Sequence, residues 1–332
     1  MAFREILTPL PAVVGPTASG KTALAIALAK RLGGEILCCD SMQIYRGMDI
    51  GTAKPTIEEQ AAVPHHLFDL LSPGTPYSAA DYAADAYRAV EGLLARGCLP
   101  VFCGGTGLYL EAARRGGAEN EEIPGRTDLR EALVAESERP GGMDALWQQL
   151  CEVDPTSAAA THKNNVRRVI RALEIYKTTG IPKSEWDRRS RERRPALHIY
   201  PIALHYPDRE LLYRRIDARV DEMLRKGLCE ETERLLQAGH LAPGSTAAQA
   251  IGYKELLPYL RGECTLGEAR EALCLATRHY AKRQLTWFLR DKSITWLPAT
   301  DERGRMRPLS SLAEEGERAF KERAKEEVRG NR

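Results

Sequence analysis

The sequence lacks the features that mark secreted, membrane-spanning and zinc-binding proteins. Its N-terminus, MAFREILTPLPAVVG, contains no apolar run of about 7–15 residues, so we expect no secretory signal. No stretch reaches the roughly 18 consecutive apolar residues of a membrane helix, so we expect no membrane partner. The eight cysteines form no C-x-x-C pair and no Cys/His set with zinc-finger spacing. This usage argues against a zinc site and favours reduced thiols in a cytoplasmic protein.

Net charge is also small. The formal charge is only +2 over 332 residues, so any affinity for nucleic acid must come from local clusters of charge. One cluster, residues 163–194, has eleven Lys/Arg against four Asp/Glu. This basic cluster could be a charged face exposed to solvent or a surface that binds a polyanion. A second cluster, residues 277–292, interleaves cations with aromatic side chains, which suits unpaired RNA bases, although the aromatics could equally belong to the core.

Over residues 11–110 the sequence predicts strands that alternate with helices. Residues 12–15, 35–40 and 99–105 are predicted strands, and residues 21–32 and 77–97 are predicted helices. This order predicts an α/β fold with a parallel sheet, whose ligands bind beyond the carboxyl ends of the strands.

After about residue 112 the pattern becomes helical, and a strand returns at 197–204. Helices are then predicted at 208–238, 247–261 and 266–290. We therefore predict four parts: an α/β core over 1–112, a helical insertion over 113–196, a return to the core followed by further helices over 197–300, and a charged tail over 301–332 that forms a loosely attached helix or is disordered.

The segment GPTASGKT, residues 15–22, fits the phosphate-binding pattern G-x-x-x-x-G-K-[ST] and stands between a strand and a helix. Backbone N–H groups of such a loop and the positive end of the helix dipole hold a di- or triphosphate. Lys21 adds a cation, and the Thr22 hydroxyl suits Mg²⁺. The expected diphosphate-binding residues are Gly15, Pro16, Thr17, Ala18, Ser19, Gly20, Lys21 and Thr22.

Asp40 ends the second predicted strand and faces the same edge of the sheet. It could hold a metal through water, act as a general base, or cap the turn before Ser41, and its position alone leaves these three roles open. A second glycine loop, GGTG at 104–107, lacks the spacing of a dinucleotide fingerprint; Thr106 within it could bond a phosphate or a ribose.

Seven segments occur in the order found in bacterial tRNA dimethylallyltransferases, the tRNA isopentenyltransferases of the IPP transferase family. The chain resembles that family over roughly residues 11–297, and DSMQIYRGMDIGTAKP at 40–55 is the most specific segment. The others are GPTASGKT, VPHHLFDL, GGTGLY, NNVRRVIRALEIYKTTG, AIGYKEL and YAKRQLTWF.

The resemblance implies a P-loop-like α/β core over 1–112, a helical insertion over 113–196 that binds tRNA by clasping its anticodon stem-loop, and helices within 197–300 that line a tRNA channel. It implies transfer of a dimethylallyl group from dimethylallyl diphosphate to N6 of adenosine 37, with release of diphosphate and with Mg²⁺ as cofactor. Asp40 would then be the general base, while Lys21 and Arg219 would stabilise the leaving diphosphate. The target base would have to leave its stack to reach the site. We expect a monomer.

The resemblance also supplies further site residues. Thr17 and Thr106 match positions near the donor and the reacting nucleotide, and Thr106 is counted among the catalytic residues. The residues expected to contact tRNA are Asp40, Ser41, Met42, Gln43, Arg167, Arg168, Arg171, Gln249, Gly252, Tyr253, Lys254, Lys282, Arg283 and Gln284.

The chain departs from the family pattern in three places. His162-Lys163-Asn164-Asn165 replaces the usual His-Pro-Asn-Asp, and TWFLRDK carries one residue more than usual before Arg290. The C-terminal zinc finger of eukaryotic relatives is missing, which indicates a bacterial form.

Two other functions remain to be compared with this one. An ATP-dependent P-loop kinase of a small metabolite or nucleotide would explain residues 15–22 but neither the basic insertion nor the 40–55 segment. An RNA-binding protein with a degenerate P-loop would not need Lys21, Thr22 and Asp40.

Overall fold

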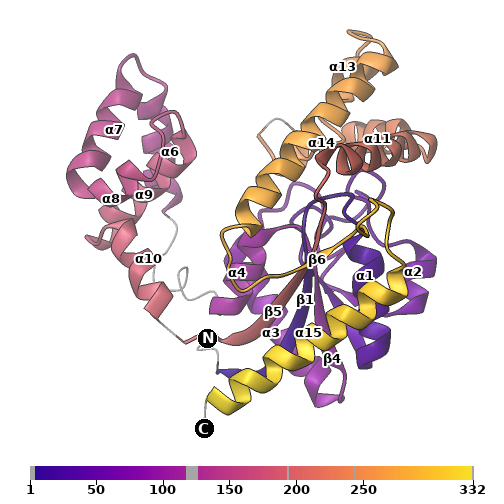
Figure 1. Cartoon of the computed structure of the whole chain (residues 1–332). Helices are drawn as coiled ribbons and strands as arrows, with labels where there is room; N and C mark the ends of the chain where they lie inside the picture. The colour runs from indigo at the N-terminus through magenta and orange to yellow at the C-terminus, as the bar shows by residue number, and fades with distance from the viewer. Residues whose placement is uncertain (1–3, 117–125, 193, 243, 331–332) are drawn as a thin grey trace. The chain divides into compact units, whose positions relative to one another are not determined.

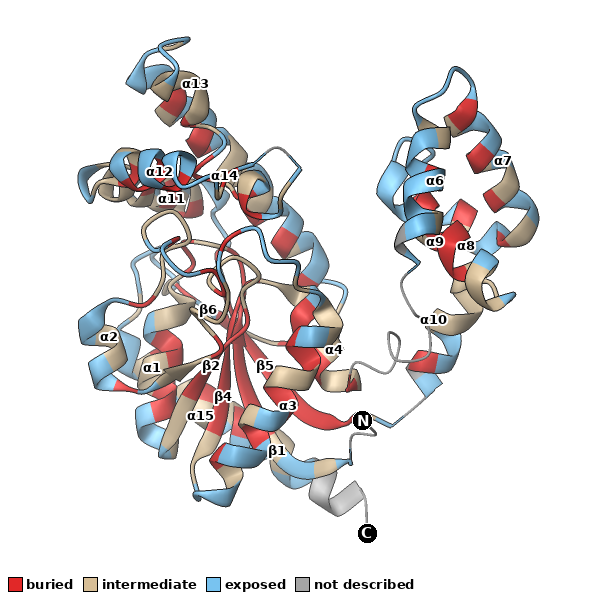
Figure 2. Cartoon of the chain, turned by 180° about the vertical axis from the view of Figure 1, so that it is seen from behind, coloured by how far each residue is buried: buried red, intermediate tan, exposed pale blue. Residues whose placement is uncertain are grey.

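The computed structural model describes residues 4–116, 126–192, 194–242 and 244–330. The chain divides into two compact units, one containing Arg115–Ala196 and the other containing Ile6–Arg114 and Leu197–Arg332. Each unit has its own set of buried side chains (Figure 2). Residues 117–125, which follow the change of pattern predicted near residue 112, lie outside the described residues.

A sheet covered by helices forms the centre of the larger unit (Figure 1). The sheet has six parallel strands in the order β3-β2-β4-β1-β5-β6. The strands are β1 Ile6–Val14, β2 Gly34–Cys38, β3 His65–His66, β4 Leu99–Gly104, β5 Leu197–His205 and β6 Thr295–Pro298. Every pair of neighbours in the sheet is parallel. The end of β1 is buried from Leu10 to Val14, as expected for a strand covered on both faces.

Helices of this unit connect the strands and cover the sheet. They are α1 Lys21–Leu32, α2 Ile57–Ala62, α3 Ala79–Ala95, α4 Gly107–Arg115, α11 Arg209–Arg225, α12 Leu228–Gln237, α13 Leu257–Leu260, α14 Leu266–Phe288 and α15 Leu309–Gly330, with a 3₁₀ turn η1 at Ala247–Gln249. The connections β1-α1-β2 and β2-α3-β4 run in opposite directions along the sheet. Since such crossovers are right-handed, α1 and α3 cover opposite faces.

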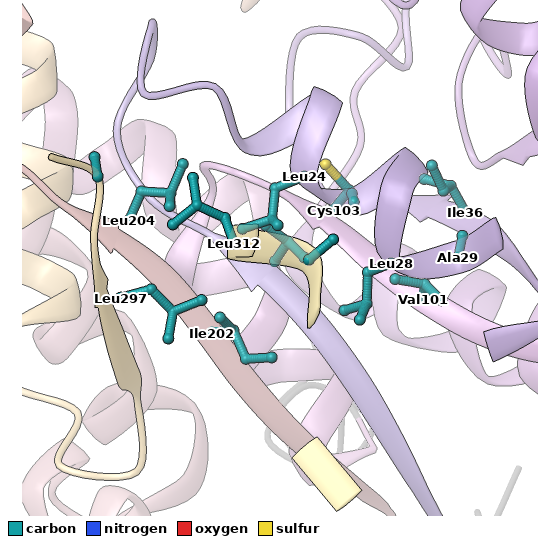
Figure 3. Packing of buried hydrophobic residues seen from close by; sticks show 14 of the residues in the cluster. Leu24, Leu28, Ala29, Ile36, Val101, Cys103, Ile202, Leu204, Leu297 and Leu312 are labelled. Carbon is teal, nitrogen blue, oxygen red and sulfur yellow. The ribbon is translucent and has the colours of Figure 1, made fainter. Parts of the chain in front are cut away.

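The core on one face of the sheet gathers around α1. Leu24 and Leu28 of α1 lie against strand residues such as Val101 and Ile202 and against Leu312 of α15 (Figure 3). These helix positions are four residues apart and share one face of α1. Burial of this face fixes α1, and with it the loop that precedes it.

Helix α15 corrects the expectation for the tail. We expected residues 301–332 to be loosely attached, because the segment is charged and Phe320 is its only aromatic residue. Instead α15 packs on α1 and β5, and Leu312, Ala313 and Phe320 are buried (Figure 1). The Phe320 ring meets Tyr200 edge to face at 6.1 Å. The apolar residues recur at helical spacing and make one buried stripe, which the overall charge of the segment concealed.

The smaller unit is helical. Its described helices are α6 Thr127–Ser137, α7 Gly142–Val153, α8 Pro155–Ala159, α9 Val166–Thr179 and α10 Lys183–Glu192. Leu146, Leu150, Val169 and Leu173 lie in its core. Asp154 is buried, and its carboxylate accepts hydrogen bonds from the N–H groups of Ser157 and Ser184, which ties α8 to α10.

Most predicted elements are present, with shifted ends. β1 begins six residues before the predicted Ala12, because Ile6–Val14 pairs with β5 through a register irregularity. The predicted helix over 208–238 is interrupted at Lys226–Gly227, where Gly227 has a φ of 96° and caps α12. β3 and β6 were not predicted; they have two and four residues, too few for a periodic pattern. Within the described ranges, no helix has the length and apolar character needed to cross a bilayer.

Candidate functional site

Three loops meet where neighbouring strands end. β1 leads into residues 15–20, β2 leads to Asp40, and β4 leads into the second glycine loop; in the sheet the order of these strands is β2-β4-β1. Hydrogen bonds join the last two loops: Cys39 N–H donates to the Cys103 carbonyl (2.7 Å) and Thr106 N–H donates to the Cys39 carbonyl (3.2 Å). A Cβ on Gly104 would lie 1.9 Å from the Cys39 carbonyl oxygen, so this close approach requires glycine. The predicted convergence of the loops is therefore confirmed.

The phosphate loop turns sharply at two glycines. Gly15 has a φ of 140° and Gly20 has a φ of 90°, values that residues with a Cβ atom rarely adopt. Ala18 is also left-handed, with a φ of 60°. Helix α1 begins directly after Gly20, so its positive dipole end lies at the loop.

Two side chains from beyond β5 hold this loop by its carbonyl groups. The Tyr206 hydroxyl donates to the Ser19 carbonyl (2.6 Å), and Arg215 Nε donates to the Ala18 carbonyl (2.8 Å). The carbonyl groups of Ser19 and Ala18 are therefore already hydrogen-bonded to protein side chains. Neither residue was predicted, although Arg215 precedes Arg219 by four residues and so shares its helix face.

Lys21 and Arg219 form the cationic part of the site. Burial lowers the pKa of Lys21, and the neighbouring Arg219 lowers it further. Burial likewise lowers the pKa of Arg219, while nearby Asp40 opposes the shift. Two neighbouring, half-buried cations that disfavour each other are stabilised when a polyanion enters, so this pair is suited to a diphosphate.

Two cavities meet at this pair. The first, of about 250 Å³, is lined by Asp40, Ser41 and Met42, by Ile216 and Val220 of α11, and by several residues of α14. The second, of about 770 Å³, is lined by the outer part of the phosphate loop, by Arg215 and by Lys54. Lys21, Thr22 and Arg219 line both cavities, so two ligands could approach the same cations from different sides.

Asp40 lies in the first cavity with one oxygen fixed. Its Oδ1 accepts a hydrogen bond from the N–H of Met42 at 2.9 Å, which is the turn-capping contact considered for it. Next to it, Ser41 N–H donates to Thr106 Oγ1 at 3.0 Å. These contacts orient the carboxylate toward a cavity that also contains Lys21 and Arg219.

Several cavity residues are held by buried polar groups. The Gln43 amide donates to the carbonyls of Thr52 and Ala53, both at 3.0 Å. The Glu231 carboxylate is 2% exposed and accepts hydrogen bonds from three successive N–H groups, at residues 49–51, as well as from the Tyr253 hydroxyl. Glu231 therefore fixes the rim of the cavity. The sequence alone does not indicate this role, because a glutamate on a polar helix is usually exposed.

Helix α9 of the smaller unit presents exposed basic residues. Arg167 and Arg168 are exposed, whereas Arg171 Nη1 donates to the buried carboxylate of Glu174 at 3.0 Å. Arg130 also contacts Glu174, at 2.9 Å. Arg171, expected to share an RNA-facing surface with Arg167, is thus partly committed to the fold of its own unit.

Comparisons with known proteins agree on one family. The chain matches the IPP transferase family over residues 43–291 and the isopentenyl transferase family over residues 9–65. It is 49% identical over 293 residues to a tRNA dimethylallyltransferase of Geobacillus thermodenitrificans, covering 87% of this chain and 90% of that protein. The chain belongs to the tRNA dimethylallyltransferase family. A second tRNA dimethylallyltransferase, of Geobacter sulfurreducens, is 45% identical over 290 residues, 87% of this chain and 92% of that protein.

Solved structures of the family share the fold of this enzyme. A full-length tRNA isopentenylpyrophosphate transferase from Bacillus halodurans is 40% identical, with a TM-score of 0.70 over 98% of this chain and 99% of that one. A eukaryotic dimethylallyltransferase, studied while acting on tRNA, is 30% identical, with a TM-score of 0.75 over 89% of this chain and 74% of that one. The predicted family, the P-loop-like α/β class and the prenyltransferase activity are confirmed.

The structure brings most of the expected site residues together. The first cavity is lined by Thr17, Lys21, Thr22, Asp40, Ser41, Met42, Gln43, Arg219, Gln249, Gly252, Lys254, Arg283 and Gln284. Thr106 lies beside this cavity through its bond to Ser41, and Lys282 is exposed on α14.

Two residues expected to contact tRNA are buried instead. Tyr253 is 0% exposed and its hydroxyl donates to Glu231, and Gln284 is 5% exposed with its amide bonded to backbone groups. Both side chains support the site from the interior, because their polar atoms already have protein partners.

All eight cysteines are free. Cys103 lines the first cavity, where burial raises the pKa of its thiol to about 11, although nearby Lys21 opposes the shift. A thiol with such a pKa is a poor nucleophile at neutral pH. Cys103 is therefore part of the cavity wall.

Proposed function

We propose that the enzyme transfers the dimethylallyl group of dimethylallyl diphosphate to N6 of adenosine 37, next to the anticodon of tRNA, in the cytoplasm. The observation that carries this proposal is the meeting of two cavities at Lys21 and Arg219, with Asp40 on one side and the phosphate loop on the other. A donor and an acceptor can therefore reach one reacting centre from different sides.

The diphosphate of the donor is assigned to the phosphate loop. Its charge would be held by backbone N–H groups of residues 18–22, by the dipole of α1 and by the half-buried cations Lys21 and Arg219. Negative charge grows on the diphosphate as the allylic C–O bond breaks, so Lys21 and Arg219 stabilise the transition state more than the bound donor.

The adenine is assigned to the first cavity, beside Asp40. An adenine N6 is a poor nucleophile, because its lone pair is delocalised into the ring. Asp40 accepts the proton that N6 loses as the new N6–C bond forms, and diphosphate is the other product. Met42 N–H, bonded to Oδ1, keeps the carboxylate in the orientation that this proton transfer needs.

A divalent cation fits this donor set. Among the described residues there is no cluster of three or more Asp, Glu, His or Cys that could enclose a metal. The Thr22 hydroxyl nevertheless places an oxygen ligand on both cavities, and Mg²⁺ commonly takes few protein ligands and completes its shell with phosphate and water oxygens. Bound there, Mg²⁺ would neutralise charge on the diphosphate.

A transfer assay tests the proposal. The enzyme is incubated with radiolabelled dimethylallyl diphosphate and an unmodified anticodon stem-loop, with a matched RNA carrying guanosine in place of adenosine 37. We expect label only in the first RNA. Hydrolysis of ATP together with unlabelled RNA would favour a P-loop kinase and overturn the proposal.

A further inference from the structure

A single buried side chain joins the two glycine loops of the site. Gln284, on α14, is 5% exposed. Its Oε1 accepts a hydrogen bond from the N–H of Thr17 at 2.9 Å, and its Nε2 donates to the carbonyl of Gly105 at 2.9 Å. The amide thus uses both of its ends on backbone groups, one in each loop.

The second glycine loop is shaped to receive this helix. A Cβ on Gly105 would lie 2.2 Å from Gln284 Nε2, and a Cβ on Gly107 would lie 2.2 Å from the Trp287 ring. Gln284 and Trp287 are three residues apart and share one face of α14. A side chain at either position would displace Gln284 or Trp287 from the place that it occupies against this loop.

The bond to Thr17 supplies the phosphate loop with a support that its other contacts do not. Tyr206 and Arg215 bind the carbonyls of Ser19 and Ala18, whereas Gln284 binds an N–H at the start of the turn. With the turn held at these three points, the N–H groups that follow Ala18 are kept in fixed positions. A preorganised set of donors binds an anion without a reorganisation cost.

We propose that Gln284 is a positioning residue, which holds the phosphate loop against the second glycine loop and thereby sets the affinity for the donor diphosphate. This inference rests on the proposed function for the identity of the donor. Gln284 acts through Thr17 and Gly105, because its amide groups are already bonded to them. Its loss should therefore weaken diphosphate binding and leave tRNA binding unchanged.

The test compares Gln284→Leu, which removes both hydrogen bonds at similar volume, with Gln284→Glu, which keeps the acceptor for Thr17 and sets an oxygen against the Gly105 carbonyl. Gln237→Glu is the matched control, since Gln237 is exposed at the end of α12 and bonds only Glu233 among described side chains. Calorimetry measures the binding of inorganic pyrophosphate, and steady-state kinetics give KM for dimethylallyl diphosphate and for tRNA.

We expect both Gln284 variants to weaken pyrophosphate binding and to raise the donor KM in parallel, by tenfold or more, with the tRNA KM within twofold of wild type. Gln237→Glu should match wild type in all three. Melting curves show whether each variant is folded at the assay temperature.

Pyrophosphate affinity of Gln284→Glu, measured at several pH values, distinguishes positioning by hydrogen bonds from a general loss of structure. The protonated carboxyl group has the same acceptor and donor pattern as the amide, and burial raises its pKa. Pyrophosphate affinity relative to wild type should therefore recover as the pH falls from 8 to about 6.

Pyrophosphate affinities within twofold of wild type in folded Gln284 variants would overturn the inference. Equal increases in the KM for dimethylallyl diphosphate and in the KM for tRNA would also overturn it. If wild-type enzyme labelled no RNA but the pyrophosphate difference persisted, the proposed function would fail and the role of Gln284 would stand.

Discussion

At the scale of single residues, Asp40 carries the most specific expectation. Its Oδ1 is fixed by Met42 N–H in a cavity that is also lined by the cations Lys21 and Arg219. Asp40→Asn, which keeps this hydrogen bond but cannot accept a proton, should reduce turnover by about 10²–10⁴-fold. Affinity for tRNA should stay within a few-fold, because the shape of the cavity is preserved.

Single-turnover transfer and filter binding measure these two quantities separately. Asp208→Asn is the matched control: Asp208 is exposed and caps α11, and asparagine caps a helix equally well. Equal losses of turnover and tRNA affinity in Asp40→Asn would assign Asp40 to binding rather than to proton transfer.

Lys21 predicts how diphosphate binding depends on pH. Burial and Arg219 lower the pKa of Lys21 in the free enzyme, and only the charged amine attracts a diphosphate. Affinity for pyrophosphate should therefore fall as the pH rises, beginning below the usual pKa of lysine, and bound pyrophosphate should raise the pKa of Lys21 by linkage.

Calorimetry between pH 7 and pH 10 checks this direction. In Lys21→Arg the cation stays charged over that range, so the decline attributable to residue 21 should disappear. A wild-type affinity that is constant up to pH 10 would contradict the lowered pKa.

The sequence revealed the residues that match a motif and missed those that support it. Lys21, Thr22 and Asp40 were found because a short pattern fixes their places after strands. Glu231 and Tyr206 act through bonds to segments about 180 residues away, and a single sequence contains no record of such distances. Gln284 was found by resemblance, but its role as a buried amide became visible only with its two backbone partners.

At the scale of elements, α15 shows how composition can mislead. The segment is rich in charge, but Phe320 is 7% exposed and packs against Tyr200. Phe320→Ala should lower the free energy of unfolding by about 3–5 kcal/mol, because a large buried ring is replaced by a cavity.

Chemical denaturation measures this loss. Leu309→Ala is the control on the same helix, since Leu309 is 42% exposed and its truncation should change the free energy of unfolding little. If Phe320→Ala lowered the free energy of unfolding by less than about 1 kcal/mol, α15 would be loosely attached, as its charge suggested.

At the scale of the whole molecule, the chain divides into a P-loop unit and a helical unit, each with its own core. Arg167 and Arg168 lie exposed on α9 of the helical unit. Replacing both with glutamine should weaken tRNA binding and reduce the slope of log K against log salt by up to about 0.9 for each phosphate that the protein no longer neutralises.

Binding measured between about 50 and 200 mM salt tests this prediction. Lys30→Gln combined with Arg318→Gln removes the same charge from exposed positions of the other unit and should leave the slope unchanged. An unchanged slope in the Arg167 and Arg168 double variant would make that face of α9 a solvated surface.

The tight packing at the second glycine loop has a consequence for mutational scans of the whole chain. A Cβ at Gly104, Gly105 or Gly107 would come within 1.9–2.2 Å of another atom. The atom facing Gly104 is the Cys39 backbone carbonyl, whereas the atoms facing Gly105 and Gly107 belong to the side chains of Gln284 and Trp287, which can move aside. Saturation mutagenesis with a growth readout should therefore find Gly104 as intolerant as Asp40, although it has no side chain to take part in the reaction. Intolerance to substitution would thus mark here both the reacting group and the place where two loops touch, and only a separate measurement of folding would tell them apart.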